Sequence, residues 1–233
     1  MTRKANILIV EDEEAIRTGL IDLLVYHGYD TDAASDGNVA LDMALKGTYD
    51  LILLDVMLPG MDGFAICDCI RSKDREQPII MLTAKSSDED IIQGLQLGAD
   101  DYVAKPFSVA QLVLRIQAVL RRARIGIETE HVLQLGSNVE VDTRNLCGRC
   151  GDKDITFTRR EIDMLQYLSA NKDRPVSRDE LLNKLWGYAK DLNLETRTVD
   201  IHIAKLRRKI EDDASIPKVL VTVRGAGYRL MVD

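Results

Sequence analysis

The chain has 233 residues, which is long enough to bury two separate hydrophobic cores, and we expect two domains. Residues 1–122 carry 12 Lys and Arg against 20 Asp and Glu, a net charge of −8, whereas residues 123–233 carry 19 against 18, a net charge of +1; together they give the −7 of the whole chain. This average excludes a uniformly basic nucleic-acid binder, so any such surface must be local to the second half.

The N-terminal apolar stretch, residues 7–10, runs straight into four acidic residues. We therefore expect no secretory or membrane segment, no membrane partner, and a cytoplasmic protein.

Short apolar runs alternate with amphipathic segments from residue 6 to residue 122. The runs predict parallel strands covered on both faces, and they occupy residues 6–10, 51–54, 79–82 and 102–104. Apolar residues at helical spacing predict helices over residues 13–25, 36–45, 63–71, 88–97 and 108–122. Five alternations of strand and helix with right-handed crossovers predict an α/β fold: a doubly wound five-stranded parallel sheet in the flavodoxin-like order 2-1-3-4-5.

Polar side chains follow the ends of these apolar runs. Glu11 and Asp12 follow the first run, Asp55 the second, Thr83 the third and Lys105 the last. Because the carboxyl ends of parallel strands meet at one sheet edge, where such sheets bind ligands, we expect these side chains to converge. Any one of them is more simply a solvated cap or a loop residue, but all five in this order favour a shared site.

This set of residue types predicts phosphoryl transfer to a carboxylate. Three carboxylates repel one another unless a cation lies among them, and Mg2+ prefers a few hard oxygen ligands. Asp55 on the middle strand would be the nucleophile and form an acyl phosphate, while Mg2+ and Lys105 neutralise the phosphoryl oxygens. Thr83 would donate its hydroxyl to the new phosphate, and Tyr102 would swing inward when Thr83 moves.

The competing class is a phosphatase with an aspartyl nucleophile, as in haloacid-dehalogenase-like hydrolases. Such enzymes carry a second acid two residues after the nucleophile, and that position is Met57 here. Without a general acid the acyl phosphate should persist, so we expect slow self-dephosphorylation and no multiple-turnover enzyme.

The first half resembles the receiver domain of bacterial two-component response regulators. The motifs that carry this resemblance are ILIVED at 7–12, LDVMLPGMDG at 54–63, LTA at 82–84 and GADDYVAKPF at 98–107. The resemblance implies a CheY-like receiver over residues 1–122, phosphotransfer from a sensor histidine kinase to Asp55, and a cis peptide before Pro106. It also implies Mg2+ ligation by Glu11, Asp12, Asp55 and the backbone carbonyl of Met57.

The same resemblance implies that phosphorylation favours a symmetric receiver dimer through residues 88–97, 101–104 and 108–122. Asp101 with Arg115, and Asp100 with Arg122, remain available as intermolecular pairs. A third pair common in relatives is replaced by Ile91 and Gln111, which removes both charges together. We expect a dimer that relies more on apolar contact at Ile91 than on salt-sensitive pairs.

The second half begins after an aperiodic linker at residues 123–130. Short strands are predicted at 132–135, 139–142 and 154–158, and helices at 160–170, 177–185 and 196–211. A glycine-containing hairpin then pairs residues 220–223 with 228–232. This order predicts an α+β winged helix-turn-helix domain over residues 131–233.

The last predicted helix concentrates positive charge. Residues 197–209 hold five basic residues against Asp200, a net charge of +4. Its apolar stripe is Val199, Ile203, Leu206 and Ile210, and its opposite face is predicted to carry Arg197, Ile201, Ala204, Lys205 and Arg208. On an isolated helix such a face would simply be exposed to solvent. An alternative is that the basic residues bind an acidic protein. The hairpin that follows favours a DNA-recognition helix with a wing.

This half resembles the winged-helix effector domain of the OmpR/PhoB subfamily. The motifs are FTRRE at 157–161, RTVDIHIAKLRRK at 197–209 and VRGAGYR at 223–229. By position, the resemblance implies DNA contacts at Arg197, His202, Lys205, Arg207, Thr222, Arg224 and Tyr228. We add Ile201 for a thymine methyl, and note that Ala204 stands where relatives have Arg. The resemblance also implies repeated half-sites in promoter DNA and presentation of residues 186–194 to RNA polymerase.

Four cysteines complete the inventory: Cys67, Cys69, Cys147 and Cys150. In a reducing compartment free thiols are the favoured expectation. The pair at 147 and 150 has the spacing of half a zinc site, and metal or redox chemistry there is the less favoured alternative.

Overall fold

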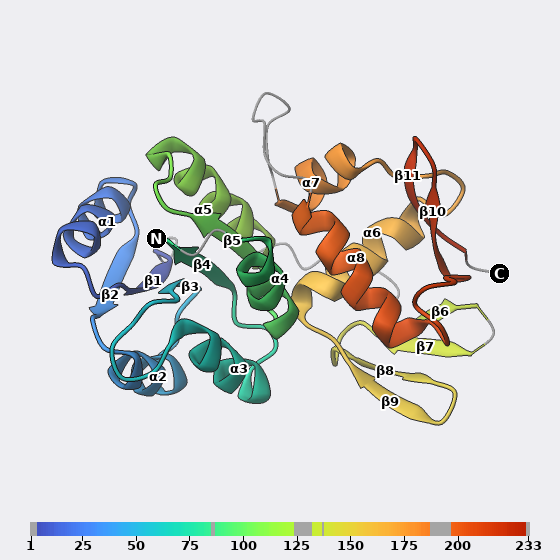
Figure 1. Cartoon of the computed structure of the whole chain (residues 1–233), viewed down its shortest axis with the longest axis horizontal. Coiled ribbons are helices and arrows are strands. Elements are labelled where there is room, and N and C mark those ends of the chain that lie inside the picture. The colour runs from blue at the N-terminus through green and yellow to red at the C-terminus, as the bar shows by residue number, and fades with distance from the viewer. Residues whose placement is uncertain (1–3, 85–86, 124–131, 137, 187–196, 232–233) are drawn as a thin grey trace. The chain divides into compact units, whose positions relative to one another are not determined.

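The computed structural model describes residues 4–84, 87–123, 132–136, 138–186 and 197–231 (Figure 1). The chain forms two compact units, Met1–Ile125 and Gly126–Asp233. The predicted linker starts inside the last helix of the first unit, and residues 124–130 lie outside the described residues.

The first unit is built on a five-stranded parallel sheet in the order β2-β1-β3-β4-β5, which confirms the predicted fold. The strands are β1 (Asn6–Val10), β2 (Asp30–Ala34), β3 (Leu51–Asp55), β4 (Ile79–Thr83) and β5 (Asp101–Ala104). Every residue of β3 and β4 is buried, because helices cover both faces of the sheet.

Five helices flank this sheet. They are α1 (Glu14–Tyr26), α2 (Gly37–Lys46), α3 (Gly63–Lys73), α4 (Asp88–Leu97) and α5 (Val109–Ala123). Leu20 of α1 and Ile116 of α5 share one core with Ile9 and Leu53 of the sheet, so these two helices cover the same face (Figure 1). Asp36, Asp62 and Ser87 cap α2, α3 and α4 by accepting backbone N–H groups of the first turn.

The strand β2 has the sequence DTDAA and carries no apolar run. It lies at one edge of the sheet, where of its five residues only Ala34 is buried. An edge strand has one neighbour and tolerates exposed polar side chains, which is why hydrophobicity alone does not locate it.

The second unit combines a small sheet, three helices and a hairpin, as a winged helix requires. The antiparallel sheet consists of β6 (Val132–Leu135), β7 (Val139–Asp142), β8 (Cys147–Cys150) and β9 (Lys153–Thr156). The helices α6 (Arg159–Ala170), α7 (Arg178–Trp186) and α8 (Arg197–Ile210) precede the hairpin of β10 (Leu220–Val223) and β11 (Gly227–Leu230), which we call the wing.

The predicted apolar stripe of α8 forms the centre of this unit's core. Val199, Ile203, Leu206 and Ile210 are each at most 1% exposed, and they pack in one cluster with Trp186. Thr158 starts α6 with a capping box closed by Glu161.

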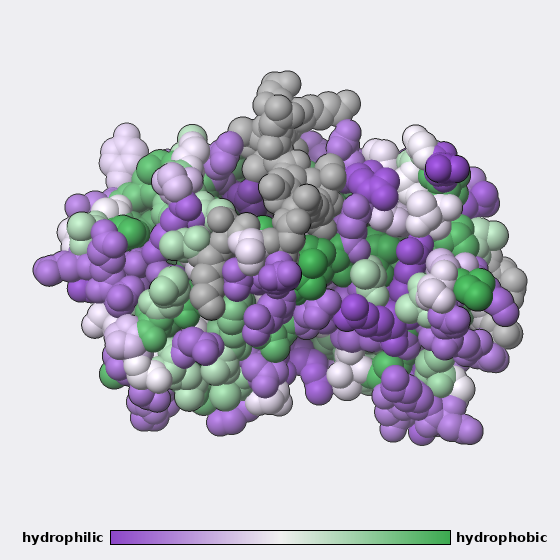
Figure 2. Space-filling view, viewed as in Figure 1, coloured by the Kyte–Doolittle hydropathy of each residue, from purple (hydrophilic) through white to green (hydrophobic). Residues whose placement is uncertain are grey.

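The thiols of Cys147 and Cys150 are free and half-buried on β8. Residues three apart on a strand point to opposite faces, so this pair does not aim two sulfurs at one point. Hydrophilic side chains are spread over both units on the face shown in Figure 2. Among the described helices, none has the length and apolar character that crossing a membrane demands.

Candidate functional site

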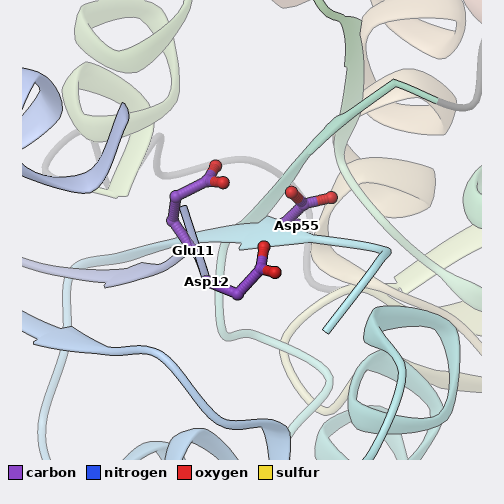
Figure 3. A group of neighbouring side chains, drawn as sticks. All are labelled: Glu11, Asp12 and Asp55. Atoms are coloured by element: carbon purple, nitrogen blue, oxygen red, sulfur yellow. The ribbon is translucent and has the colours of Figure 1, made fainter. Parts of the chain in front are cut away.

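Three carboxylates meet at the carboxyl edge of the receiver sheet. Glu11 and Asp12 follow β1, and Asp55 is the last residue of β3 (Figure 3). One carboxylate oxygen from each residue lies within 4.8 Å of the other two. Among the described residues, these three side chains form a cluster that could hold a metal ion. Glu11 and Asp55 are buried, whereas Asp12 is exposed.

Lys105 joins two of these carboxylates. Its Nζ donates to Oε2 of Glu11 and to Oδ2 of Asp55, each at 2.6 Å. Burial would lower the pKa of Lys105, but its hydrogen bonds to Asp55 and Glu11 outweigh this and raise it. Burial raises the pKa of Glu11, and the hydrogen bond from Lys105 opposes that rise. The ammonium therefore stays charged between them.

Backbone contacts fix the two loops that carry the acids. The N–H of Met57 donates to Oδ1 of Asp55 at 3.0 Å, which orients the carboxylate. Arg17 of α1 donates to the backbone carbonyls of Glu11 and Asp12 at 2.8 and 2.9 Å. Sequence patterns gave no indication of Arg17, because the contact is to backbone and leaves no complementary residue to recognise.

Two further residues lie beside the acids: Thr83 at the end of β4, and Tyr102 on β5. Thr83 is fully buried, and Tyr102 is only 6% exposed. Burial and the charge of Asp90 raise the pKa of Tyr102 to about 12, while a hydrogen bond with Thr83 opposes this rise. In this structure the Tyr102 side chain already lies inward, which is the position we expect it to take when Thr83 moves. The peptide between Lys105 and Pro106 is cis, as expected.

The donor set suits a hard divalent cation. One ammonium against three carboxylates leaves a local excess of negative charge, and the described residues include no side chain that donates to Asp12. Three carboxylate groups, of which Asp12 is exposed to solvent, fit Mg2+, because this ion binds through few protein groups and retains bound waters.

The dimer residues predicted from sequence are partly engaged within the chain. Asp101 pairs with Arg115 at 2.7 Å, and Asp100 pairs with Arg71 at 3.0 Å. Asp100 also accepts the N–H of Ile79, and it is 6% exposed. Both acids are therefore paired within the single chain, and the intermolecular pairs expected for Asp101 with Arg115 and Asp100 with Arg122 stay predictions. Ile91 and Gln111 are half-buried on α4 and α5, and the side chain of Arg122 lies outside the described residues.

The predicted DNA-binding residues divide by exposure. Thr222 and Arg224 are exposed on the wing, and Ile201 is half-exposed on α8. Arg207 is half-buried and donates to the Leu220 carbonyl and to Oγ1 of Thr222, both at 2.8 Å. The side chain of Arg197 lies outside the described residues.

Two other predicted contacts, His202 and Tyr228, are buried, and a third, Lys205, is half-buried. His202 is 1% exposed with its ring centre 5.3 Å from that of Trp186. Lys205 pairs with the fully buried Glu161 at 3.3 Å, so it does not belong to the outward face of α8. Tyr228 is 4% exposed and its hydroxyl donates to Asp200. DNA contacts at these three positions stay a prediction, and a helical wheel does not show that Trp186 and Glu161 pack beside α8.

Comparisons with known proteins agree with both halves. Residues 7–117 match the family described as Response regulator receiver domain, and residues 152–230 match Transcriptional regulatory protein, C terminal. A probable transcriptional regulator ycf27 of Porphyra purpurea is 40% identical over 231 residues, 97% of this chain and 94% of that protein. The sensory transduction protein RegX3 of Mycolicibacterium smegmatis is 41% identical over 228 residues, 97% and 98% of the two chains.

The chain belongs to the OmpR/PhoB family of response regulators. Solved structures of similar chains include a mutant of RitR, with 31% identity, a TM-score of 0.75 and coverage of 97% of this chain and 99% of that one. DrrB of Thermotoga maritima, described as an OmpR/PhoB homolog, has 28% identity, a TM-score of 0.53 and coverage of 99% and 100%.

As an OmpR/PhoB response regulator, the protein is a phosphorylation-activated regulator of transcription with a DNA-binding output. It is not a classical enzyme, and the phosphatase alternative is not favoured. Its receiver implies a histidine kinase partner, and its C-terminal domain implies DNA.

Proposed function

We propose that Asp55 accepts the phosphoryl group from a phosphohistidine of a sensor kinase. The observation that carries this is the position of its carboxylate, at the end of a central strand, held by Lys105 at 2.6 Å and flanked by Glu11 and Asp12. The P–N bond of the donor breaks as the O–P bond to Asp55 forms. Both partners, kinase and promoter DNA, would be met in the cytoplasm.

Glu11, Asp12 and Asp55, with the carbonyl of Met57, would hold Mg2+. When bound, the ion would supply charge neutralisation for the phosphoryl oxygens. Lys105, just after β5, would supply a fixed ammonium to the same oxygens. Three carboxylates in reach of one another and one exposed member, Asp12, support this assignment.

Thr83 and Tyr102 would report the phosphorylation. The hydroxyl of Thr83 donates to the acyl phosphate, and Tyr102, which already hydrogen-bonds Thr83, follows its movement. Met57 is exposed where a phosphatase places a general acid, so nothing on that residue protonates a leaving group. The acyl phosphate therefore persists and is lost by slow self-dephosphorylation.

Activation would couple to dimerisation through α4, β5 and α5. Because Asp100 and Asp101 are paired within the chain, Ile91 and the neighbouring exposed Ile92 support an interface that depends mainly on apolar contact. Two effector domains would then bind repeated half-sites about one helical turn apart, with Arg224 and Thr222 on the wing and Ile201 on α8. Residues 187–194, outside the described residues, would be presented to RNA polymerase with Trp186 at their start.

Phosphorylation by acetyl phosphate with Mg2+ tests the central assignment. Intact-protein mass spectrometry should show one added phosphoryl group on the wild type and none on Asp55→Asn. Asp68→Asn is a matched control, because Asp68 is an exposed acid on α3. Labelling of Asp55→Asn at the wild-type level, or rapid repeated hydrolysis of small phosphate esters, would refute the assignment.

A further inference from the structure

The buried end of Tyr228 joins three elements of the effector domain. Its hydroxyl donates to Oδ1 of Asp200 on α8 at 2.6 Å. Arg178 of α7 donates to the same Oδ1 from Nε at 2.7 Å and to the Tyr228 oxygen from Nη2 at 2.9 Å. The guanidinium carbon of Arg178 also lies 4.8 Å from the centre of the tyrosine ring. We call Arg178, Asp200 and Tyr228 the wing triad.

A second contact ties the other strand of the wing to the same helix. Arg207 of α8 donates to the Leu220 carbonyl and to Thr222 of β10, each at 2.8 Å. Its guanidinium carbon lies 5.7 Å from the ring centre of Tyr228. Both strands of the wing are therefore hydrogen-bonded to α8, β10 through Arg207 and β11 through Asp200.

We propose that Asp200 is a positioning residue for DNA recognition: through Arg178 and Tyr228 it sets the wing at a fixed distance and angle from α8, so that both reach the duplex together. This rests on the DNA-binding function and deepens it. Asp200 acts through its two partners and is not itself assigned a contact with DNA. Its side chain is 44% exposed, so the hydrogen bonds rather than burial hold it in place.

The charge of Asp200 makes positioning and plain electrostatics predict opposite results. A carboxylate on the recognition helix repels DNA phosphates, so its removal should tighten binding if charge alone decides. If Asp200 sets the wing, its removal weakens binding at a selected sequence, because wing and helix no longer engage their sites simultaneously. Binding to unselected DNA depends on charge and not on register, so it should stay equal or rise.

The chain offers a matched control in a second group of the same composition. Tyr167 donates to Oε1 of Glu180 at 2.7 Å, and Arg174 donates to both oxygens of Glu180 at 2.6 and 2.8 Å. This group joins α6 to α7 and includes no residue of α8 or of the wing. Tyr167→Phe therefore removes the same hydroxyl-to-carboxylate bond without touching the proposed alignment.

The experiment compares Asp200→Ala, which removes both the charge and the acceptor, with Tyr228→Phe, the double variant and Tyr167→Phe in the full-length protein. The probes are a fluorescent duplex that the phosphorylated wild type selects from a random-sequence pool, and unselected duplexes of that pool. We expect Asp200→Ala and Tyr228→Phe each to weaken binding to the selected duplex at least about tenfold, the loss of one hydrogen bond to a charged group. The double variant should be no weaker than Asp200→Ala alone, because the hydrogen bond that Tyr228→Phe removes is already absent once Asp200 is replaced by alanine.

Several outcomes would overturn the proposal. Asp200→Ala that binds both probes as well as or better than wild type would show that only charge matters. A tenfold loss in Tyr167→Phe as well would show a general loss of domain stability. Fluorescence of Trp186, the single tryptophan, confirms that each variant is folded at the assay temperature, and Tyr228→Phe keeps the test open if Asp200→Ala does not fold. A wild type that enriches no duplex would instead remove the DNA-binding function, and the proposal with it.

Discussion

Arg71 holds the end of α3 against the loop between α4 and β5, and its replacement by methionine should strongly destabilise the receiver. Its guanidinium donates to the carbonyls of Gly98 and Gln77 at 2.8 and 2.5 Å and to Oδ2 of Asp100 at 3.0 Å. Both side chains of this pair are under a tenth exposed, at 7% and 9%. Removing one partner of a buried pair costs about 3–5 kcal/mol, since the other charge stays desolvated.

Urea unfolding followed by circular dichroism measures this loss. Trp186 lies in the second unit, so its fluorescence transition in the same samples serves as an internal reference. Arg75→Met is the matched control, because Arg75 is an exposed residue just after α3. A loss of less than about 1 kcal/mol in Arg71→Met, the value for an exposed pair, would refute the inference that this contact is buried and specific.

Three further predictions concern the site, the sheet and the second unit. Lys105→Met should abolish or greatly slow labelling by acetyl phosphate. It should also lower the stability of the receiver, because Glu11 and Asp55 repel each other once the ammonium is removed. Added Mg2+ should recover part of the stability but not the labelling. Gly63→Ala should cost about 1–3 kcal/mol, since a Cβ there would lie 2.1 Å from the Asp55 carbonyl oxygen, and Ala65→Gly in the same helix, without such a clash, is its comparison in thermal unfolding. The hydrogen bond from Arg174 lowers the pKa of Glu180 from 4.5 to about 2. The ionised carboxylate therefore stabilises the fold above pH 4.5, and this contribution is lost as the pH falls towards 2. In chemical unfolding, Glu180→Gln should be less stable than wild type at pH 7 and should equal it near pH 2.

The sequence predicted the parts of the fold that depend on burial. β1, β3, β4 and β5 follow from unbroken apolar runs, and α8 follows from a stripe that is buried as expected. β2 and β8 were missed, since DTDAA and CGRC carry no apolar signal and their pairing is decided by neighbouring strands.

The candidate site divides in the same way. Glu11, Asp12, Asp55 and Lys105 converge because the topology brings strand ends together, which the order of elements already implies. The contacts of Lys205 with Glu161 and of Tyr228 with Asp200 could not be predicted, because these partners lie 44 and 28 residues away in the chain. Periodicity reports which side of a helix is apolar, but it does not report which charged group from another element packs beside it.

The two edges of the receiver sheet differ in charge and burial, so they differ in how readily a strand of another molecule could pair with them. At one edge, β2 exposes Asp30 and Asp32, whose repulsion discourages a strand of another molecule from pairing there. At the other edge, β5 is nearly all buried; its Asp101 pairs with Arg115, and Asp100, just before the strand, pairs with Arg71. The exposed acids of β2 therefore oppose strand-to-strand aggregation at that edge, whereas the ion pairs beside β5 leave the opposite edge without the same repulsion.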